Sequence, residues 1–301
     1  MVFGSGMAAA TCVFLSLVPG DHVIAPRVMY WALRDWLARH SHLEVSFVDA
    51  ELSAFEQALI PGRTRLVWIE TPANPMWNIT DIEAVSTLAH QAGARVAVDS
   101  TVATPVFTRP LALGADLVMH SATKYLNGHS DVVAGALVAR EADAHWQKLK
   151  ALRVQLGVIP GPFECYLLVR GMRTLFPRVR LAAASALALA LKLTGHSNIA
   201  QVLYPGLPEF PGHEVAARQM RGGFSAMLSI RVSGGEAAAI ATAAKVRLWK
   251  RATSLGGVES LVEHRASVEG PDSPCPRDLL RLSVGIESVD DLYADLAQAL
   301  A

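Results

Sequence analysis

The sequence predicts an α/β fold, with a mostly parallel sheet in a large domain and a smaller α+β domain at the C-terminus. Two observations carry this prediction. In the first half of the chain, short strand-like segments alternate with helical stretches, a pattern typical of parallel strands joined by right-handed crossovers. Some of these segments, such as 66–69 and 96–98, are continuously apolar. Such continuously apolar sequences are typical of strands that are buried on both faces of a sheet.

The expected elements follow in order along the chain. Strands are expected at 22–26, 45–49, 65–71, 95–101, 116–121 and 132–140. Helices are expected at 8–17, 29–40, 81–92 and 141–155, and one long helix at 163–193. The stretch 198–211 contains four prolines and glycines and predicts a domain junction. Residues 1–194 are therefore expected to form the large domain and residues 195–301 the small one, with strands at 226–232 and 279–286 and a closing helix at 289–300.

Composition argues against several classes of function. Lys+Arg and Asp+Glu both number 27, so the zero net charge opposes bulk electrostatic binding of nucleic acid or of an anionic membrane. It also fits a chain that hides surface in a homo-oligomer. The apolar start has no positive residue before Arg27, and the run 181–191 is too short to cross a bilayer. Three widely spaced cysteines indicate neither a disulfide framework nor a metal site, so a cytoplasmic protein is expected.

Lys124 is the first candidate for chemistry, because it follows the strand ending near His120 and two hydroxyl residues, Ser121 and Thr123. Ligands of open α/β sheets bind at the carboxyl ends of strands. A lysine forms a Schiff base only as the neutral amine, so such a site must lower its pKa. A solvated surface lysine is the alternative.

Other polar residues stand at similar places. Asp99 closes an apolar strand, where it either pairs with a protonated pyridine nitrogen or caps a turn. Gly6 and Met7 open a helix after Ser5 and could bind a phosphate, although such pairs are more often ordinary caps. Tyr30 follows another strand and could either stack on an aromatic ring or pack in the core.

Two more residues could face the same crevice. The loop Glu70–Pro75 contains two prolines and would direct Asn74 across the strand ends, unless it is only a rigid turn. Arg281 lies in an apolar strand and would bind either a substrate carboxylate or an internal acidic side chain. A dinucleotide-binding enzyme is rejected, because no GxGxxG follows the first strand.

These segments together resemble the Cys/Met-metabolism family of fold-type I pyridoxal 5′-phosphate (PLP) enzymes, the group of the cystathionine γ-synthases, cystathionine γ-lyases and O-acylhomoserine sulfhydrylases. The resemblance covers essentially the whole chain. The matching runs are SGMAA at 5–9, PGDHVI at 19–24, ETPANP at 70–75, VDSTVATP at 98–105, GADLVMHSATKYLNGHSDVVAG at 114–135, RGMRTL at 170–175, YPGLP at 204–208, SLGG at 254–257 and RLSVGIE at 281–287.

The resemblance implies a role for each matching residue. Lys124 would hold PLP covalently and move protons, while Asp99 would pair with the pyridine nitrogen. The phosphate would be held by Gly6, Met7, Ser121 and Thr123. Tyr30 would stack on the ring and assist proton transfer, and Asn74 would lie near the ring oxygen. Arg281 would bind the substrate carboxylate, with Ser254 nearby.

The resemblance also has departures. Family members usually begin several dozen residues upstream, with a Tyr-x-Arg segment that reaches the phosphate of the neighbouring subunit, and nothing here matches it. The loop Glu263–Pro276 replaces a Thr-His-Ala-containing loop of the small domain, and Ala32 replaces a cysteine that methionine γ-lyases carry. We therefore expect phosphate affinity, dimer assembly and substrate choice to be the properties most affected.

The resulting expectation is a PLP-dependent transsulfuration enzyme that acts on small sulfur-containing amino acids, by carbon–sulfur cleavage or by γ-replacement. It would be a cytoplasmic homodimer or homotetramer with no nucleic-acid or membrane partner. The alternative is a truncated, weakly active or non-catalytic PLP-binding paralogue.

Overall fold

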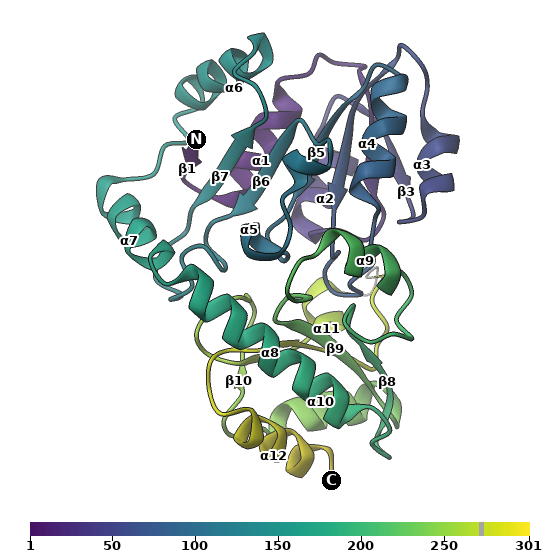
Figure 1. Ribbon diagram of the computed structural model, residues 1–301, viewed down its shortest axis with the longest axis vertical. Helices are drawn as coiled ribbons and strands as arrows, with labels where there is room; N and C mark the ends of the chain where they lie inside the picture. The colour runs from purple at the N-terminus through teal and green to yellow at the C-terminus, as the bar shows by residue number, and fades with distance from the viewer. Residues whose placement is uncertain (271–273) are drawn as a thin grey trace.

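A seven-stranded sheet forms the first half of the molecule (Figure 1). The computed structural model describes residues 1–270 and 274–301. The strands are β1 (Val2–Phe3), β2 (His22–Pro26), β3 (Glu44–Val48), β4 (Thr64–Glu70), β5 (Arg95–Asp99), β6 (Leu117–Ser121) and β7 (Gly135–Ala139), in the order β1-β7-β6-β5-β4-β2-β3. The neighbours from β6 to β3 are all parallel, and β7 is antiparallel to both β6 and β1. The predicted mostly parallel sheet is confirmed.

Helices cover both faces of this sheet, which explains its continuously apolar strands. Along β4, Leu66 and Trp68 pack with α1 and α2 on one face, whereas Val67 and Ile69 pack with α3 and α4 on the other. All four side chains are at most 1% exposed. The helices of this half are α1 (Gly6–Leu15), α2 (Trp31–Arg39), α3 (Leu52–Ala58), α4 (Ile82–Gln91), α5 (Thr104–Phe107), the short 3-10 helix η1 (Pro110–Leu113) and α6 (Ala144–Gln155).

The expectation of one helix over 163–193 is wrong. The chain forms α7 (Pro162–Met172) and α8 (Leu175–Leu193), which meet at a bend of 59°. Pro177 explains the break, because a proline has no N–H and is tolerated only in the first turn of a helix. Within the described residues, no single helix is long and apolar enough to cross a membrane, and only α7 and α8 taken together across their bend reach that length and composition.

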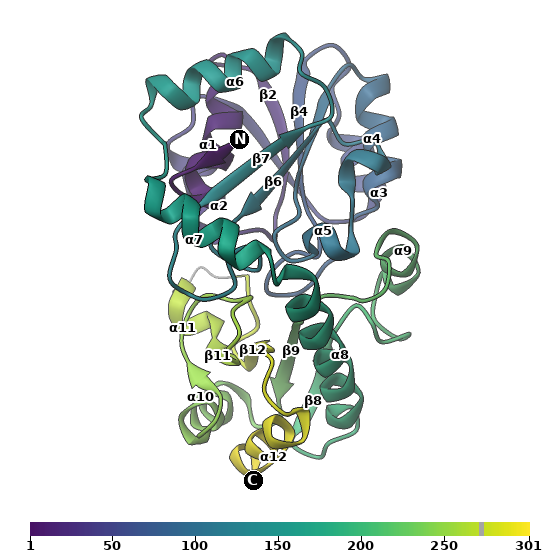
Figure 2. The ribbon, with the colours of Figure 1, turned by 60° about the vertical axis from the view of Figure 1, so that its left-hand side comes forward.

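The second sheet is five-stranded and lies below the first in Figure 2. It contains β8 (Ile199–Leu203), β9 (Met227–Val232), β10 (Lys250–Arg251), β11 (Leu261–His264) and β12 (Leu279–Ser283), in the order β10-β11-β12-β9-β8. Its helices are α9 (His213–Gln219), α10 (Gly235–Lys245), α11 (Arg265–Glu269) and α12 (Val289–Leu300). Strand β8 lies inside the stretch that was expected to be a junction. The division into residues 1–194 and 195–301 remains a proposal.

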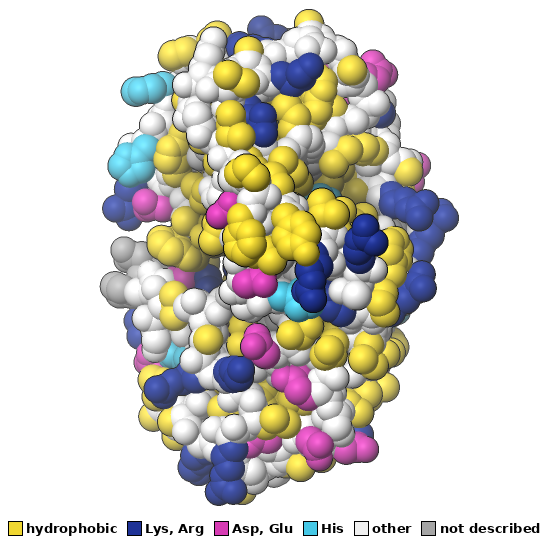
Figure 3. All heavy atoms as spheres, turned by 90° about the vertical axis from the view of Figure 1, so that its left-hand side faces the viewer, with side chains coloured by type: hydrophobic (Ala, Val, Ile, Leu, Met, Phe, Trp, Pro, Cys, Tyr) yellow, Lys and Arg dark blue, Asp and Glu magenta, His cyan; other side chains and the backbone are white. Residues whose placement is uncertain are grey.

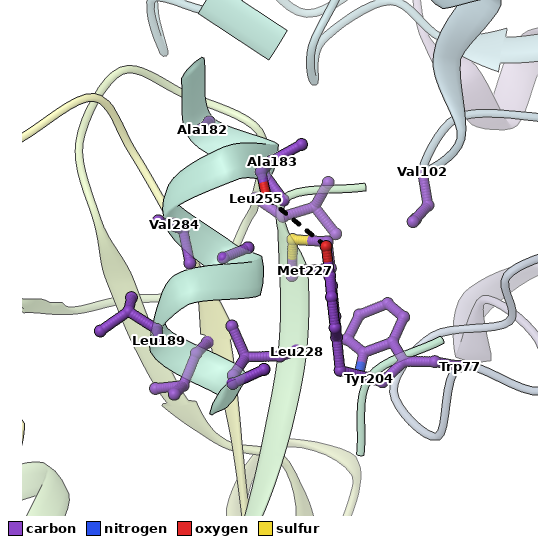
Figure 4. Packing of buried hydrophobic residues seen from close by; sticks show 14 of the residues in the cluster. Trp77, Val102, Ala182, Ala183, Leu189, Tyr204, Met227, Leu228, Leu255 and Val284 are labelled. Carbon is purple, nitrogen blue, oxygen red and sulfur yellow. Dashed lines mark hydrogen bonds between the residues drawn. The ribbon is translucent and has the colours of Figure 1, made fainter. Parts of the chain in front are cut away.

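An apolar core joins α8 to the second sheet and to loops of the first half. Figure 4 shows Tyr204 and Trp77 beside the strand that carries Met227, with α8 on the far side. Tyr204 donates a hydrogen bond to the carbonyl of Ser225 at 3.0 Å, and the Trp77 Nε1–H donates to Ser229 Oγ at 2.9 Å. These contacts fix the loop after β4 against the second sheet. The two halves therefore meet through buried side chains.

Candidate functional site

A cavity of about 220 Å³ opens at the carboxyl ends of four adjacent parallel strands, β2, β4, β5 and β6. Ligands of open α/β sheets bind at this edge. The cavity is lined by Ser5, Gly6, Met7, Ala10, Tyr30, Leu33, Glu70, Asn74, Asp99, Thr101, Val102, Met119, Ser121, Thr123, Lys124, Val133 and Leu255. Every residue predicted to hold the cofactor is among them. The two predicted substrate residues, Ser254 and Arg281, are not.

Lys124 projects from the segment after β6 and crosses to the second half of the chain. Its Nζ donates a hydrogen bond to Ser254 Oγ at 2.9 Å. Burial lowers the pKa of Lys124 to about 8, and the positive charge of Arg281 adds to this effect. The side chain is thus not the solvated surface lysine considered above. At neutral pH a usable fraction of this amine is uncharged and nucleophilic.

Asp99 ends β5 and lies beside Glu70, which ends β4 in register with it. Both residues are buried: Asp99 is 8% exposed and Glu70 is 6% exposed. Asp99 accepts hydrogen bonds from Thr101 N at 2.9 Å and from Thr101 Oγ1 at 2.5 Å. Burial raises the pKa of Asp99, and burial together with the charge of Asp99 raises the pKa of Glu70 to about 8. Two adjacent buried acids cannot easily both ionise unless a cation lies near them.

Helix α1 begins at the cavity. Ser5 caps it, because its Oγ accepts a hydrogen bond from Ala8 N at 3.0 Å. The N–H groups of Gly6 and Met7 precede this bond and have no acceptor within the helix. A Cβ on Gly6 would lie 2.7 Å from Ser121 Oγ, so only glycine lets the helix approach β6 this closely. The arrangement forms an anion site.

Thr123 contributes to the wall in a different way from that expected. Its hydroxyl donates to the carbonyl of Ala134 at 3.1 Å and accepts from the N–H of Ala134 at 3.0 Å. The hydroxyl has therefore already used its one donor within the protein, and it could donate to a phosphate only by releasing the Ala134 carbonyl. Ser121, by contrast, presents its side chain to the first turn of α1.

Glu70 holds the two loops that carry Tyr30 and Asn74. Its Oε2 accepts a hydrogen bond from Tyr30 N at 2.8 Å, and its Oε1 accepts one from Asn74 N at 3.2 Å. Glu70 was not predicted as a site residue, although, like Asp99, it is a carboxylate at the end of an apolar strand. Thr101 was also missed, because nothing in its position distinguishes it from an ordinary turn residue.

Arg281 lies on β12, 3% exposed, behind the cavity wall. Its Nη1 donates to Asn74 Oδ1 at 3.3 Å and its Nη2 to the carbonyl of Ser254 at 2.6 Å. Arg281 also forms an ion pair with Glu263, its partner across β11 and β12. The internal ion pair considered for Arg281 is thus present. Ser254 has a left-handed backbone, with φ of +86°, which directs its carbonyl to Arg281 and its hydroxyl to Lys124.

The loop Glu263–Pro276, expected to influence substrate choice, is more regular than its prolines indicated. Its first residues end β11, and α11 follows directly. Residues 271–273 lie outside the described residues.

PLP carries a phosphate at one end, a basic ring nitrogen at the other and an aldehyde between them, and the cavity has a counterpart for each. The start of α1 has free N–H groups of the kind that bind an anion. Asp99 is a buried acid of the same cavity, and Lys124 supplies an amine with a lowered pKa. The residues present therefore fit the group.

Comparison with known proteins agrees with this geometry. The family model described as "Cys/Met metabolism PLP-dependent enzyme" matches residues 1–301. A cystathionine gamma-synthase of Mycobacterium tuberculosis is 45% identical over 312 residues, covering 99% of this chain and 79% of the relative. A cystathionine gamma-lyase of Dictyostelium discoideum is 41% identical over 309 residues, covering 99% and 79%. The crystal structure of cystathionine gamma synthase from Xanthomonas oryzae pv. oryzae in complex with cystathionine superimposes with a TM-score of 0.94 at 42% identity, covering 99% of this chain and 80% of that one.

Proposed function

The chain belongs to the Cys/Met metabolism PLP-dependent enzyme family, and from this premise we propose that it is a transsulfuration enzyme that makes or cleaves cystathionine. It is a PLP-dependent enzyme of sulfur amino acid metabolism, either a carbon–sulfur lyase or a γ-replacement transferase. The single observation that carries the proposal is the cavity in which Lys124, Asp99 and the start of α1 meet. No observation on the described residues favours the non-catalytic alternative.

PLP, when bound, supplies an electron sink that stabilises negative charge on the carbon atoms of an amino acid. The other functions fall to the chain. The N–H groups of Gly6 and Met7, with Ser121, would bind the phosphate, and Thr123 would donate to it only if its hydroxyl released the Ala134 carbonyl. Asp99 would hold a proton on the ring nitrogen, and Tyr30 would cover the ring face. These assignments rest on the positions of the residues around the cavity.

Proton movement would fall to Lys124. Because burial keeps its pKa near 8, the amine can both accept and return a proton at neutral pH. Its Nζ already bonds to Ser254 Oγ, which would hold the amine near one position between transfers. Asn74 would orient the ring through its side chain, and Arg281 would bind the substrate carboxylate.

The purified protein, incubated with PLP, tests this proposal. Cystathionine should release 2-oxobutyrate if the chain is a γ-lyase, and O-acylhomoserine with cysteine should yield cystathionine if it is a γ-synthase. Mass spectrometry of both mixtures separates these outcomes, and pyruvate would indicate β-cleavage instead. Lys124→Ala serves as the inactive control. Absence of all three products in a preparation that binds PLP would refute the proposal.

We further propose a cytoplasmic homodimer or homotetramer. Helix α7 supports association, because it exposes large apolar side chains to solvent: Phe163, Tyr166, Val169 and Met172 are 46–65% exposed. Figure 3 shows hydrophobic side chains gathered across the middle of the face on which this helix lies. Contiguous apolar surface of this kind marks an interaction site. The zero net charge also favours association over repulsion.

A further inference from the structure

Four charged side chains form a buried chain behind the cavity: Arg281, Glu263, Arg265 and Glu269, in that spatial order. They come from β12, β11 and α11, and each side chain is only 4–7% exposed. Buried ions are costly to desolvate, so such a chain rarely persists for stability alone.

Glu263 binds both arginines through one oxygen. Its Oε2 accepts from Arg265 Nη1 at 3.1 Å and also contacts Arg281 Nη2. Its Oε1 is buried and has no hydrogen-bond partner among the described residues. A paired, two-bond contact is the strong arrangement of arginine with carboxylate. Neither arginine forms this two-bond contact with Glu263. Each single contact can therefore be replaced by a contact with another carboxylate.

A carboxylate that arrives at Arg281 meets three existing acceptors. Two of them, Asn74 Oδ1 and the Ser254 carbonyl, are neutral, and Glu263 is the anion among the partners of Arg281 in the described part of the chain. A second carboxylate beside Glu263 is repelled unless another cation balances Glu263. Arg265 is that cation. Burial lowers the pKa of Arg281 to about 10, whereas for Arg265 the effect of burial is outweighed by Glu263 and Glu269, which raise its pKa.

We propose that Arg265 is a positioning residue. When a substrate carboxylate replaces Glu263 as the partner of Arg281, Arg265 remains paired with Glu263, and Arg265 thereby sets the affinity of the site for carboxylates. The proposal rests on the proposed function only in that the substrate is an amino acid. Arg265 touches neither the cavity nor the reacting atoms; it acts through Glu263 on Arg281.

Arg265→Met removes the charge and keeps a long apolar side chain. Among the described residues, Glu263 then has Arg281 as its remaining ion-pair partner, so an incoming carboxylate must compete with Glu263. We expect KM of the PLP-loaded enzyme to rise about tenfold while kcat changes by less than about threefold, because uniform binding is lost. Arg277→Met is the matched control, since Arg277 pairs with Glu236 on the surface and is 59% exposed; its KM should stay unchanged.

Glu263→Gln tests the same exchange from the other side. Without the internal anion, Arg281 should bind butyrate, which has a carboxylate and no amine, about threefold more tightly or better. In the double variant Arg265→Met/Glu263→Gln, butyrate affinity should return to at least the wild-type value. A purely structural role for Arg265 would instead give additive losses. Arg265→Lys, which keeps the charge, should remain near wild type.

Calorimetric titration of the PLP-loaded protein with butyrate needs no turnover, so this inference and the proposed function can fail separately. Weaker butyrate binding by Glu263→Gln, or a double variant that binds no better than Arg265→Met, would overturn the inference. Failure of every sulfur amino acid to react would overturn the proposed function alone.

Discussion

Among single residues, Glu70 stands out as a buried acid that lies beside a second acid, with no ion pair to a cation in the described part of the chain. Its two oxygens accept the backbone N–H groups of Tyr30 and Asn74, and Asp99 is its neighbour in the sheet. Those two hydrogen bonds lower the pKa of Glu70, but burial and the charge of Asp99 outweigh them and raise it to about 8. Glu70 therefore positions the two cavity loops, and its burial beside Asp99 favours a protonated carboxyl group in this pair.

The first prediction concerns this proton. A pKa raised from 4.5 to about 8 means that the folded apoprotein binds a proton that the unfolded chain releases. Stability from this group is complete below pH 4.5 and is lost as the pH rises toward 8, by at most about 1.4 kcal/mol per pH unit. Urea unfolding of the apoprotein across this range should show the decline, and Glu70→Gln should flatten it. An equally steep decline in Glu70→Gln would assign it to another group.

The second prediction concerns Lys124. Burial lowers the pKa of this amine from 10.5 to about 8, and the neutral form is present above that value. The rate at which apoprotein captures PLP should therefore rise with pH and reach half its maximum near pH 8. Stopped-flow absorbance measures this rate. In Ser254→Ala the midpoint of this pH dependence should move, because the amine loses its hydrogen-bond acceptor. A midpoint near pH 10 in the native protein would contradict a lowered pKa of Lys124.

At the scale of elements, the close approach of α1 to β6 builds the anion site, which gives the third prediction. Gly6→Ala places a Cβ 2.7 Å from Ser121 Oγ, so the start of the helix must move away. We expect PLP affinity to fall about tenfold, a loss near 1.4 kcal/mol, in an absorbance titration. Gly4→Ala is the control, because its nearest neighbour would be 3.7 Å away. Equal affinities in the two variants would remove the helix start from the phosphate site.

The fourth prediction concerns the junction between the Lys124 segment and α8. Gly128 has φ of +75°, and a Cβ there would lie 1.9 Å from Arg178 Nη1. Arg178 cannot move freely, because it donates hydrogen bonds to the carbonyls of Tyr125 and Gly171. Gly128→Ala should therefore cost about 3 kcal/mol or more in urea unfolding, from backbone strain and lost bonds. Gly157→Ala, with φ of +64° and open space around it, should cost only about 1 kcal/mol.

The mostly parallel sheet and the grouping of residues at the carboxyl ends of its strands were predictable, because parallel strands place those ends at one edge, whereas the order of the strands was not predicted. Less predictable was the break between α7 and α8, where the alanine- and leucine-rich pattern continues across the bend and only Pro177 signals it. The state of Arg281 depends on Glu263, which is its neighbour only through the pairing of β11 and β12. Such pairings between distant segments leave little local trace in a sequence.

At the scale of the whole molecule, the apolar side chains of α7 are the feature that the isolated chain leaves exposed, and they give the fifth prediction. Val169→Glu places a charge on α7 at a residue that is 57% exposed. Sedimentation velocity with PLP present should show dissociation toward monomer, because a charge opposes burial in an interface. Ile240→Glu, on α10 with 44% exposure, should leave assembly unchanged. Identical sedimentation of both variants would place the interface elsewhere.

The crossing of Lys124 to Ser254 and of Asn74 to Arg281 has a consequence for how this enzyme can change over evolution. The residues assigned to the cofactor lie between Gly6 and Lys124, whereas Arg281 and Ser254, assigned to the substrate's carboxylate, come from residues after 250. Substitutions in the later segment can therefore alter what is recognised, provided that the contacts of Ser254 and Arg281 with the reactive half are kept. New specificities can arise in this scaffold without inventing new chemistry.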